Sequence, residues 1–248
     1  MSQIDQSAVR NRLLASLPPT EFARLAVFLT PTDLSLRQVL LEANEPIETA
    51  YFVETGMVSY LAYLKGGEAI EVGIIGSEGM VGMPLILGVD SGPAGAIVQM
   101  QGTALSIAPA ALRQVFGESD TLRFQLLRYM QALYTQVSQT AVCNGHHSIE
   151  ERLARWMLMA HDRAGRDQFP MTHEFMAMML GVRRSGVTVT AGTLKQAGLI
   201  AYGNGQMAIL DRSGMEATAC ECYGTVQHHF EQLFGDDAVK SAQPKCRF

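Results

Sequence analysis

The sequence has few cysteines, and it lacks both a long apolar run and an export signal. Its four cysteines are Cys143, Cys220, Cys222 and Cys246, so the first half has none. A disulfide framework needs more cysteines for this length, and a transmembrane helix needs about 18 consecutive apolar residues. The N-terminus also lacks the basic region and apolar core of a signal peptide. We therefore expect a cytoplasmic protein with no membrane segment.

Charged residues are also scarce, and the acidic ones outnumber the basic ones. They make up 17% of the chain, which has a formal net charge of −5. Taken whole, this argues against nucleic acid, because affinity for phosphate comes from lysine and arginine. The charge is uneven, however: residues 1–150 carry −6, residues 151–212 carry +3 and residues 213–248 carry −2. The total therefore hides a basic segment.

The apolar content, at 48% of 248 residues, is enough for a sizeable core. Residues 6–30 show helical spacing, interrupted by Pro18 and Pro19. From residue 33 to 109, short runs rich in Val, Ile, Tyr and Leu alternate with Gly, Asn and Pro. Regular short strands of this kind predict a β sandwich, roll or barrel.

A long helix is predicted from Thr121 to Asn144, where neither proline nor glycine occurs. Apolar residues recur there at heptad spacing, with a second row every seven residues beside them. Such a seam favours pairing with a partner helix, although a core helix of one domain remains the plain alternative. The predicted subunit interface comprises Leu126, Met130, Leu133, Tyr134, Val137 and Ala141.

The basic segment has the outline of a winged helix-turn-helix. Ser148 and Glu151 form a predicted capping box, and Thr172 is a predicted N-cap of a short helix that ends at Gly181. A second helix is predicted from residue 182 to 198. The Gly203-Asn204-Gly205 stretch between two apolar runs then predicts a hairpin.

The second helix contradicts local propensity. Residues 187–190 are four β-branched residues in a row, and Gly186 and Gly192 each cost about 1 kcal/mol inside a helix. We nevertheless predict a helix, because Val187, Ala191 and Leu194 recur at helical spacing. Two adjacent arginines stand at its start, where such helices meet base edges.

The chain resembles the Crp/Fnr family of bacterial transcription regulators over nearly its whole length. The most specific stretch runs from Met171 through Gly181-Val182-Arg183-Arg184-Ser185 to Ile200, and Tyr51 to Val58 is similar to a strand–turn–strand of the family's β roll. The resemblance implies that Arg183, Arg184, Ser185 and Thr188 face bases and nearby phosphates. It also implies that Thr172, His173 and the wing tip with Asn204 touch the DNA backbone. One departure is that Arg183 replaces the usual Ser or Thr N-cap, so base preference cannot be transferred.

The effector site departs further from the family pattern. Members that bind cyclic nucleotides have a glutamate where this chain has Met83, and an arginine near Pro93. No lysine or arginine lies between Lys65 and Arg113. Burying a cyclic phosphate without a cation is costly, so we expect no cyclic AMP binding.

No iron–sulfur cluster is expected either, because the oxygen-sensing members use cysteines near the N-terminus and no cysteine precedes Cys143 here. No haem is expected. A metal site could be assembled from Cys220 and Cys222 with His228 and His229, or around Cys143 with His146 and His147. The Cys-x-Cys spacing is not that of a structural zinc motif. Free thiols are therefore the main prediction, with redox sensing as the alternative.

The sequence thus predicts an α+β protein with four parts. These are a double-stranded β-helix (jelly-roll-like) domain at 1–118, a dimerisation helix at 119–145, a winged helix-turn-helix domain at 146–235 and a flexible tail at 236–248. We expect a homodimer that binds a near-palindromic site in double-stranded DNA, and the resemblance implies RNA polymerase as a partner. The alternative is a regulatory dimer that has lost specific DNA binding and acts through protein partners. No catalytic constellation is evident, so we do not expect an enzyme.

Overall fold

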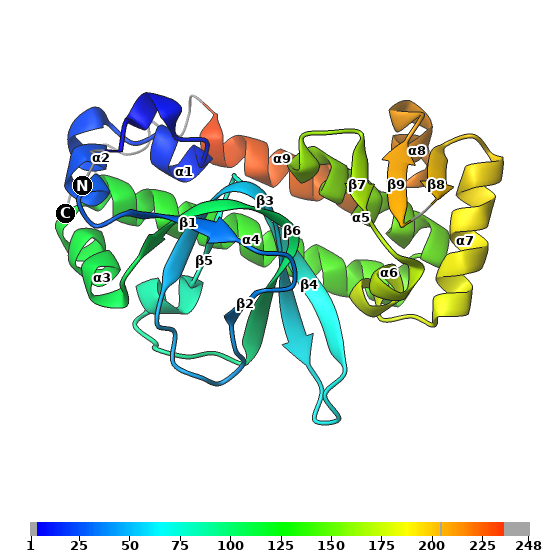
Figure 1. The fold of residues 1–248 in the computed structure, drawn as a ribbon, viewed down its shortest axis with the longest axis horizontal. Helices are drawn as coiled ribbons and strands as arrows, with labels where there is room; N and C mark the ends of the chain where they lie inside the picture. The colour runs from blue at the N-terminus through cyan, green and yellow to red at the C-terminus, as the bar shows by residue number, and fades with distance from the viewer. Residues whose placement is uncertain (1–3, 204, 236–248) are drawn as a thin grey trace, which may run out of the picture.

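The computed structural model describes residues 4–203 and 205–235 and has the predicted α+β architecture. A β-sheet half and a mainly helical half lie at opposite ends of the molecule, and the long helix α4 runs behind the strands from the first toward the second (Figure 1). Among the helices of these described residues, none combines the length and the hydropathy that crossing a bilayer requires.

The first half is an antiparallel sheet preceded by short helices. Its central strands β3 and β6 are each 14 residues long and pair with one another through several register shifts, which bend the sheet into a roll. The path through the sheet is β1-β6-β3-β4, while β2 pairs with β6 and β5 with β3. The elements are a 3-10 turn Gln6–Ala8, α1 Arg12–Ala15, α2 Pro19–Ala26, β1 Thr30–Leu34, β2 Val39–Leu41, β3 Ala50–Tyr63, β4 Ala69–Ile75, β5 Met80–Val81, a 3-10 turn Met83–Leu87 and β6 Ala94–Ile107.

Two helices follow the sheet, α3 Pro109–Glu118 and α4 Asp120–His146. Ser119 caps α4 by accepting a hydrogen bond from the backbone N–H of Leu122 at 3.1 Å. The helix is therefore slightly longer than the predicted 121–144, and it passes through Gly145 before ending.

The second half contains the predicted helix-turn-helix and hairpin. Its elements are α5 Ile149–Ala164, β7 Gln168–Pro170, α6 His173–Leu180, α7 Arg184–Gln196, β8 Ile200–Gly203, β9 Gln206–Ile209, α8 Arg212–Thr218 and α9 Cys222–Phe234. The capping box of Ser148 and Glu151 is present at the start of α5. Strand β7, which was not predicted, pairs with β9 and adds a third strand to the hairpin.

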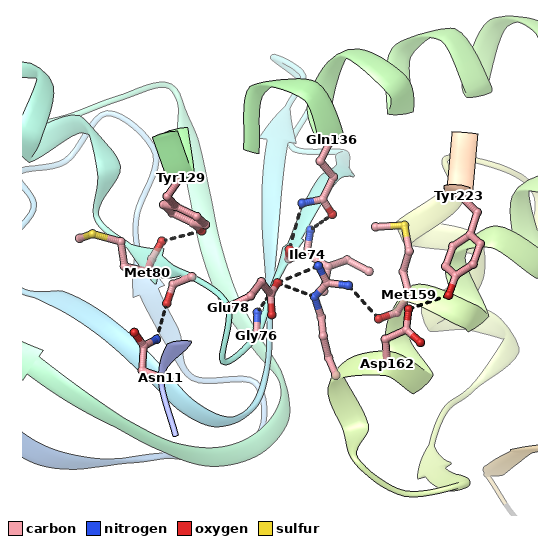
Figure 2. Close-up of polar contacts among 12 residues, drawn as sticks. Asn11, Ile74, Gly76, Glu78, Met80, Tyr129, Gln136, Met159, Asp162 and Tyr223 are labelled. Carbon is pink, nitrogen blue, oxygen red and sulfur yellow. Dashed lines mark hydrogen bonds and ion pairs between the residues drawn. The ribbon is translucent and has the colours of Figure 1, made fainter. Parts of the chain in front are cut away.

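A polar joint connects the two halves, where side chains of α4 and α5 bond the sheet (Figure 2). Buried Gln136 of α4 bonds both backbone groups of Ile74, at 3.0 and 3.1 Å. Arg163 of α5 pairs with Glu78 at 2.7 Å, and both side chains are nearly buried. These contacts hold the helical half against β4 and the turn that follows it.

A second buried group at the joint is Glu71 of β4. Its carboxylate accepts hydrogen bonds from the Trp156 indole at 2.5 Å and from the Ser59 hydroxyl at 2.6 Å. Burial raises the pKa of Glu71 to about 7, against the lowering effect of these two bonds. The carboxyl group is therefore close to half-protonated at neutral pH.

The last helix, α9, returns from the second half to pack along α4 (Figure 1). Its Val226, Phe230 and Leu233 lie in the same apolar core as the side chains inside the roll. Phe230 contacts Tyr129 of α4, with ring centroids 6.4 Å apart. Although α9 falls within the predicted DNA-binding domain at 146–235, it thus completes the core of the β-sheet half.

Candidate DNA interface

Helices α6 and α7 are joined by a tight turn at Gly181. Thr172 caps α6 as predicted, accepting a hydrogen bond from the N–H of Phe175 at 3.2 Å. Gly181 has a φ of +61° and lies so close to strand β4 that an added Cβ would come within 2.5 Å of Ile70 Cδ1. The turn therefore needs glycine for its backbone conformation, and a larger residue would also displace the end of the Ile70 side chain.

Helix α7 forms despite its β-branched residues because its inner face is fully covered. Val187, Ala191 and Leu194 are buried in the apolar core of the second half, and they lie at the helical spacing that the sequence predicted. Burial of this face outweighs the weak intrinsic propensity of the segment.

The outer face of α7 is exposed, and it carries the four predicted residues Arg183, Arg184, Ser185 and Thr188. Arg183 occupies the N-cap without a side-chain capping bond, so its guanidinium is not used by the helix end. Three residues that the sequence analysis did not select continue this face, namely Val189, Gly192 and Thr193. Val189 is 70% exposed, and its four-residue spacing from Ser185 was the signal in the sequence.

His173 joins the elements around this surface. Its Nδ1 lies 3.1 Å from the Thr188 hydroxyl, and its ring stacks on Tyr202 of β8 with centroids 4.4 Å apart. Partial burial and the nearby Arg184 guanidinium lower the pKa of His173, which favours the neutral ring. The histidine thus orients Thr188 while adding little positive charge of its own.

The predicted wing is the hairpin β8–β9. Gly203 pairs with Gln206, which leaves a two-residue turn, and Gly205 has the positive φ of +71° that such turns need. Asn204, the predicted contact at the tip, lies outside the described residues, as does the predicted tail at 236–248. Lys195 at the end of α7 donates to the Tyr202 carbonyl at 3.1 Å and ties the helix to the wing.

The six residues predicted for the subunit interface differ in their exposure. Leu126 and Leu133 are buried in the core of their own chain, against the roll and α9, so they are closed to a partner. Met130 and Val137 are half-buried, while Tyr134 and Ala141 are exposed. The exposed apolar stripe of α4 consists of Phe124, Leu127, Tyr134 and Val142.

Met83, which the resemblance aligns with the nucleotide-binding glutamate, is an apolar side chain of the roll core. It is buried, as are Leu85 and Ile86 in the same 3-10 turn. The nearby Glu78 is held by Arg163 in the joint between the halves.

The three cysteines within the described residues lie together. Cys143, Cys220 and Cys222 are buried and share one small cluster with His147. This combines parts of the two groupings that the sequence suggested and leaves out His146, His228 and His229. The expectation of no metal is therefore not confirmed.

Two family models match this chain. Residues 32–119 match the cyclic nucleotide-binding domain, and residues 151–218 match the Crp-like helix-turn-helix domain. Together these matches span more than half of the chain. No curated protein matches it in a sequence search.

Several solved structures have the same fold. FixK2 from Bradyrhizobium japonicum is 18% identical with a TM-score of 0.65, and the match covers 77% of this chain and 98% of that chain. The c-di-GMP responsive global regulator CLP of Xanthomonas campestris is 17% identical with a TM-score of 0.65, covering 78% and 100%. A Crp/Fnr-family regulator from Thermus thermophilus is 18% identical with a TM-score of 0.61, covering 77% and 98%. At these identities the similarity establishes the fold.

Proposed function

Because the chain belongs to the Crp/Fnr family of transcription regulators, we propose that it acts as a homodimer on a near-palindromic DNA site. The observation that carries this proposal is the exposed face of α7, where Arg183, Arg184, Ser185 and Thr188 lie together. Two such helices related by a dimer axis would enter successive major grooves about 34 Å apart. The protein would act by binding rather than by catalysis, in the cytoplasm and with RNA polymerase as a partner.

The residues of this face differ in what they offer to DNA. Arginine bonds guanine O6 and N7 in a bidentate manner and also pairs with phosphate, which suits Arg183 and Arg184. Ser185 and Thr188 offer hydroxyl groups, and exposed Val189 suits the methyl group of thymine. We assign phosphate and sugar contacts to Thr172, His173 and the wing tip with Asn204, which would set the register of the protein on DNA.

Subunit pairing is assigned to the exposed apolar stripe of α4 together with Ala141 beside it. Leu127, Tyr134 and Ala141 recur every seven residues, and Met130 and Val137 lie half-buried along their edge. Tyr134 is 64% exposed in the single chain, which leaves its ring free to pack against a second copy. Leu126 and Leu133 would support this helix from behind instead of facing the partner.

The effector of this protein is proposed not to be cyclic AMP. The segment between Lys65 and Arg113 has no cation to neutralise a cyclic phosphate, and Met83 fills the position of the ribose-binding carboxylate. Isothermal titration should give no binding heat with cyclic AMP. Saturable micromolar binding would contradict this assignment.

DNA recognition is tested by selecting bound sequences from a random duplex pool. We expect a palindrome with half-sites about one helical turn apart, whereas failure to enrich any sequence would favour a regulator that acts through protein partners. Arg184→Ala should abolish the specific gel shift and leave the dimer intact. The matched control is Arg24→Ala, which removes one exposed arginine from α2 at the opposite end of the molecule (Figure 1). An equal loss of binding in both variants would mean that only overall charge matters.

A further inference from the structure

The cysteine cluster lies where the long helix meets the helical half. Cys143 and His147 stand four residues apart at the end of α4, so they face the same side of its last turn. Cys220 lies between α8 and α9, and Cys222 is the first residue of α9. Two segments more than seventy residues apart in the sequence thus bring four soft donors to one point.

We propose that Cys143, His147, Cys220 and Cys222 bind one Zn²⁺ ion in a tetrahedral site that fastens α4 to the start of α9. The four donor atoms all lie within 4.8 Å of one another. The Cys143 and Cys220 sulfurs are 3.5 Å apart, and the Cys222 sulfur is 3.7 Å from His147 Nδ1. With Zn–S bonds of about 2.3 Å and a Zn–N bond of about 2.0 Å, a tetrahedron has S–S edges of about 3.8 Å and S–N edges of about 3.5 Å.

The other nitrogen of His147 supports this assignment. Its Nε2 lies 3.4 Å from a carboxylate oxygen of Glu221, the residue between the two cysteines. Histidines that bind metal through one nitrogen usually donate the N–H of the other to such a carboxylate, which fixes the tautomer and orients the ring. Glu221 would thus keep Nδ1 free of a proton and directed at the metal.

A buried arginine would balance the charge of the site. One Zn²⁺ with three thiolates and a neutral imidazole carries a net charge of −1. Arg155 of α5 is only 5% exposed, and its Nη2 donates to the Thr140 hydroxyl at 3.2 Å. Its charge acts on buried Glu71 from beyond ion-pair distance, and among the described residues its Nε has no hydrogen-bond partner. Its positive charge acts on both Cys143 and Cys222. A buried cation is costly unless a negative group lies close to it, which a zinc–thiolate centre would supply.

The burial of the thiols favours this site over a redox pair. Cys143, Cys220 and Cys222 are each no more than 5% exposed. Reactive cysteines are at least partly exposed, because the oxidant or partner thiol must reach the sulfur. A divalent cation displaces the thiol protons when it binds.

The test measures metal content and coordination in the full chain. Protein produced with zinc in the medium and purified under reducing conditions should carry one zinc per chain by mass spectrometry of the metal. Co²⁺ exchanged into the wild type should give the visible bands of a tetrahedral ion with sulfur-to-metal charge transfer. His147→Ala and Cys220→Ser should lose the metal, while the matched control His146→Ala, which changes the exposed neighbouring histidine, should keep it.

The proposal is overturned if reduced wild-type protein neither carries zinc nor develops the cobalt spectrum. It is also overturned if the intact mass of wild-type protein kept under air shows the loss of two hydrogens, with Cys143 and Cys220 linked, in place of bound metal. Because both measurements use the wild type, they remain decisive even if a variant fails to fold.

Discussion

Replacing Glu71 by glutamine should stabilise the protein at alkaline pH and leave its stability nearly unchanged in acid. Glu71 is 5% exposed, and its two oxygens accept hydrogen bonds from Trp156 and Ser59 at the joint between the halves. Glutamine has the same shape, and its amide oxygen can accept from the indole while its amide group donates to the hydroxyl. The substitution therefore removes a charge and keeps both contacts.

The pKa shift of Glu71 sets the size and the sign of the effect. Burial raises the pKa from 4.5 in the unfolded chain to about 7 in the folded one. At about 1.4 kcal/mol per pH unit, this is worth about 3 kcal/mol. Since the folded state holds the proton more tightly, the stabilisation is fully present below pH 4.5 and is lost as the pH rises to about 7. Above that range the wild type carries a buried carboxylate that the glutamine variant lacks.

Urea unfolding at a series of pH values measures this difference. The variant should exceed the wild type by about 3 kcal/mol near pH 8, and the two curves should converge near about pH 4.5. Glu68→Gln is the matched control, because it removes an exposed carboxylate from the same hairpin and should leave the wild-type pH dependence intact. Parallel curves for wild type and Glu71→Gln over the whole range would refute the reasoning.

Three further predictions test the N-cap of α6, the turn at Gly181 and the two faces of α4. Thr172→Ala should lower the free energy of unfolding by about 1 kcal/mol in a urea titration, because α6 loses its N-cap. An unchanged urea midpoint would show that the capping bond does not stabilise the protein. Gly181→Ala should cost about 1–2 kcal/mol of stability because of its positive φ. A neutral effect in the same assay would show that the turn relaxes. Leu126→Ala should cost about 3 kcal/mol of stability, because Leu126 is buried in the core of its own chain. Leu127→Ala should mainly raise the dimer dissociation constant, measured by sedimentation. Equal effects of both variants on dissociation would count against pairing through the exposed apolar stripe of α4.

Much of the second half follows from its sequence because the signals there are local. The capping box before α5, the N-cap of α6 and the hairpin turn each depend on a few neighbouring residues, and the structure contains all of them. Helix α7 was predictable only by giving weight to the spacing of Val187, Ala191 and Leu194 over β propensity. Strand β7 escaped prediction because three residues ending in proline give almost no periodic signal.

Features that depend on distant contacts could not be predicted in this way. Helix α4 has two apolar rows, and the sequence does not say which one its own sheet covers; the row with Leu126 and Leu133 proved to be the covered one. The cysteines gave a weak signal because the candidate zinc site combines residues at the end of α4 with residues at the start of α9, which lie more than seventy positions apart in the sequence. Only the return of α9 toward α4 brings Cys220 and Cys222 to Cys143.

Because α9 packs back on α4, the two halves of this chain cannot simply be exchanged with the corresponding halves of other proteins. The roll and α4 are synthesised well before the helix that covers them, so Leu126 and Tyr129 lack part of their cover until residues 222–234 have been made. A chimera that joins this β-sheet half to a foreign DNA-reading domain would leave the same apolar surface open. It would aggregate unless residues 222–234 were transplanted with the roll. A single crossover point in the sequence cannot keep this core intact, because α9 follows the DNA-reading segment in the chain but packs with the roll.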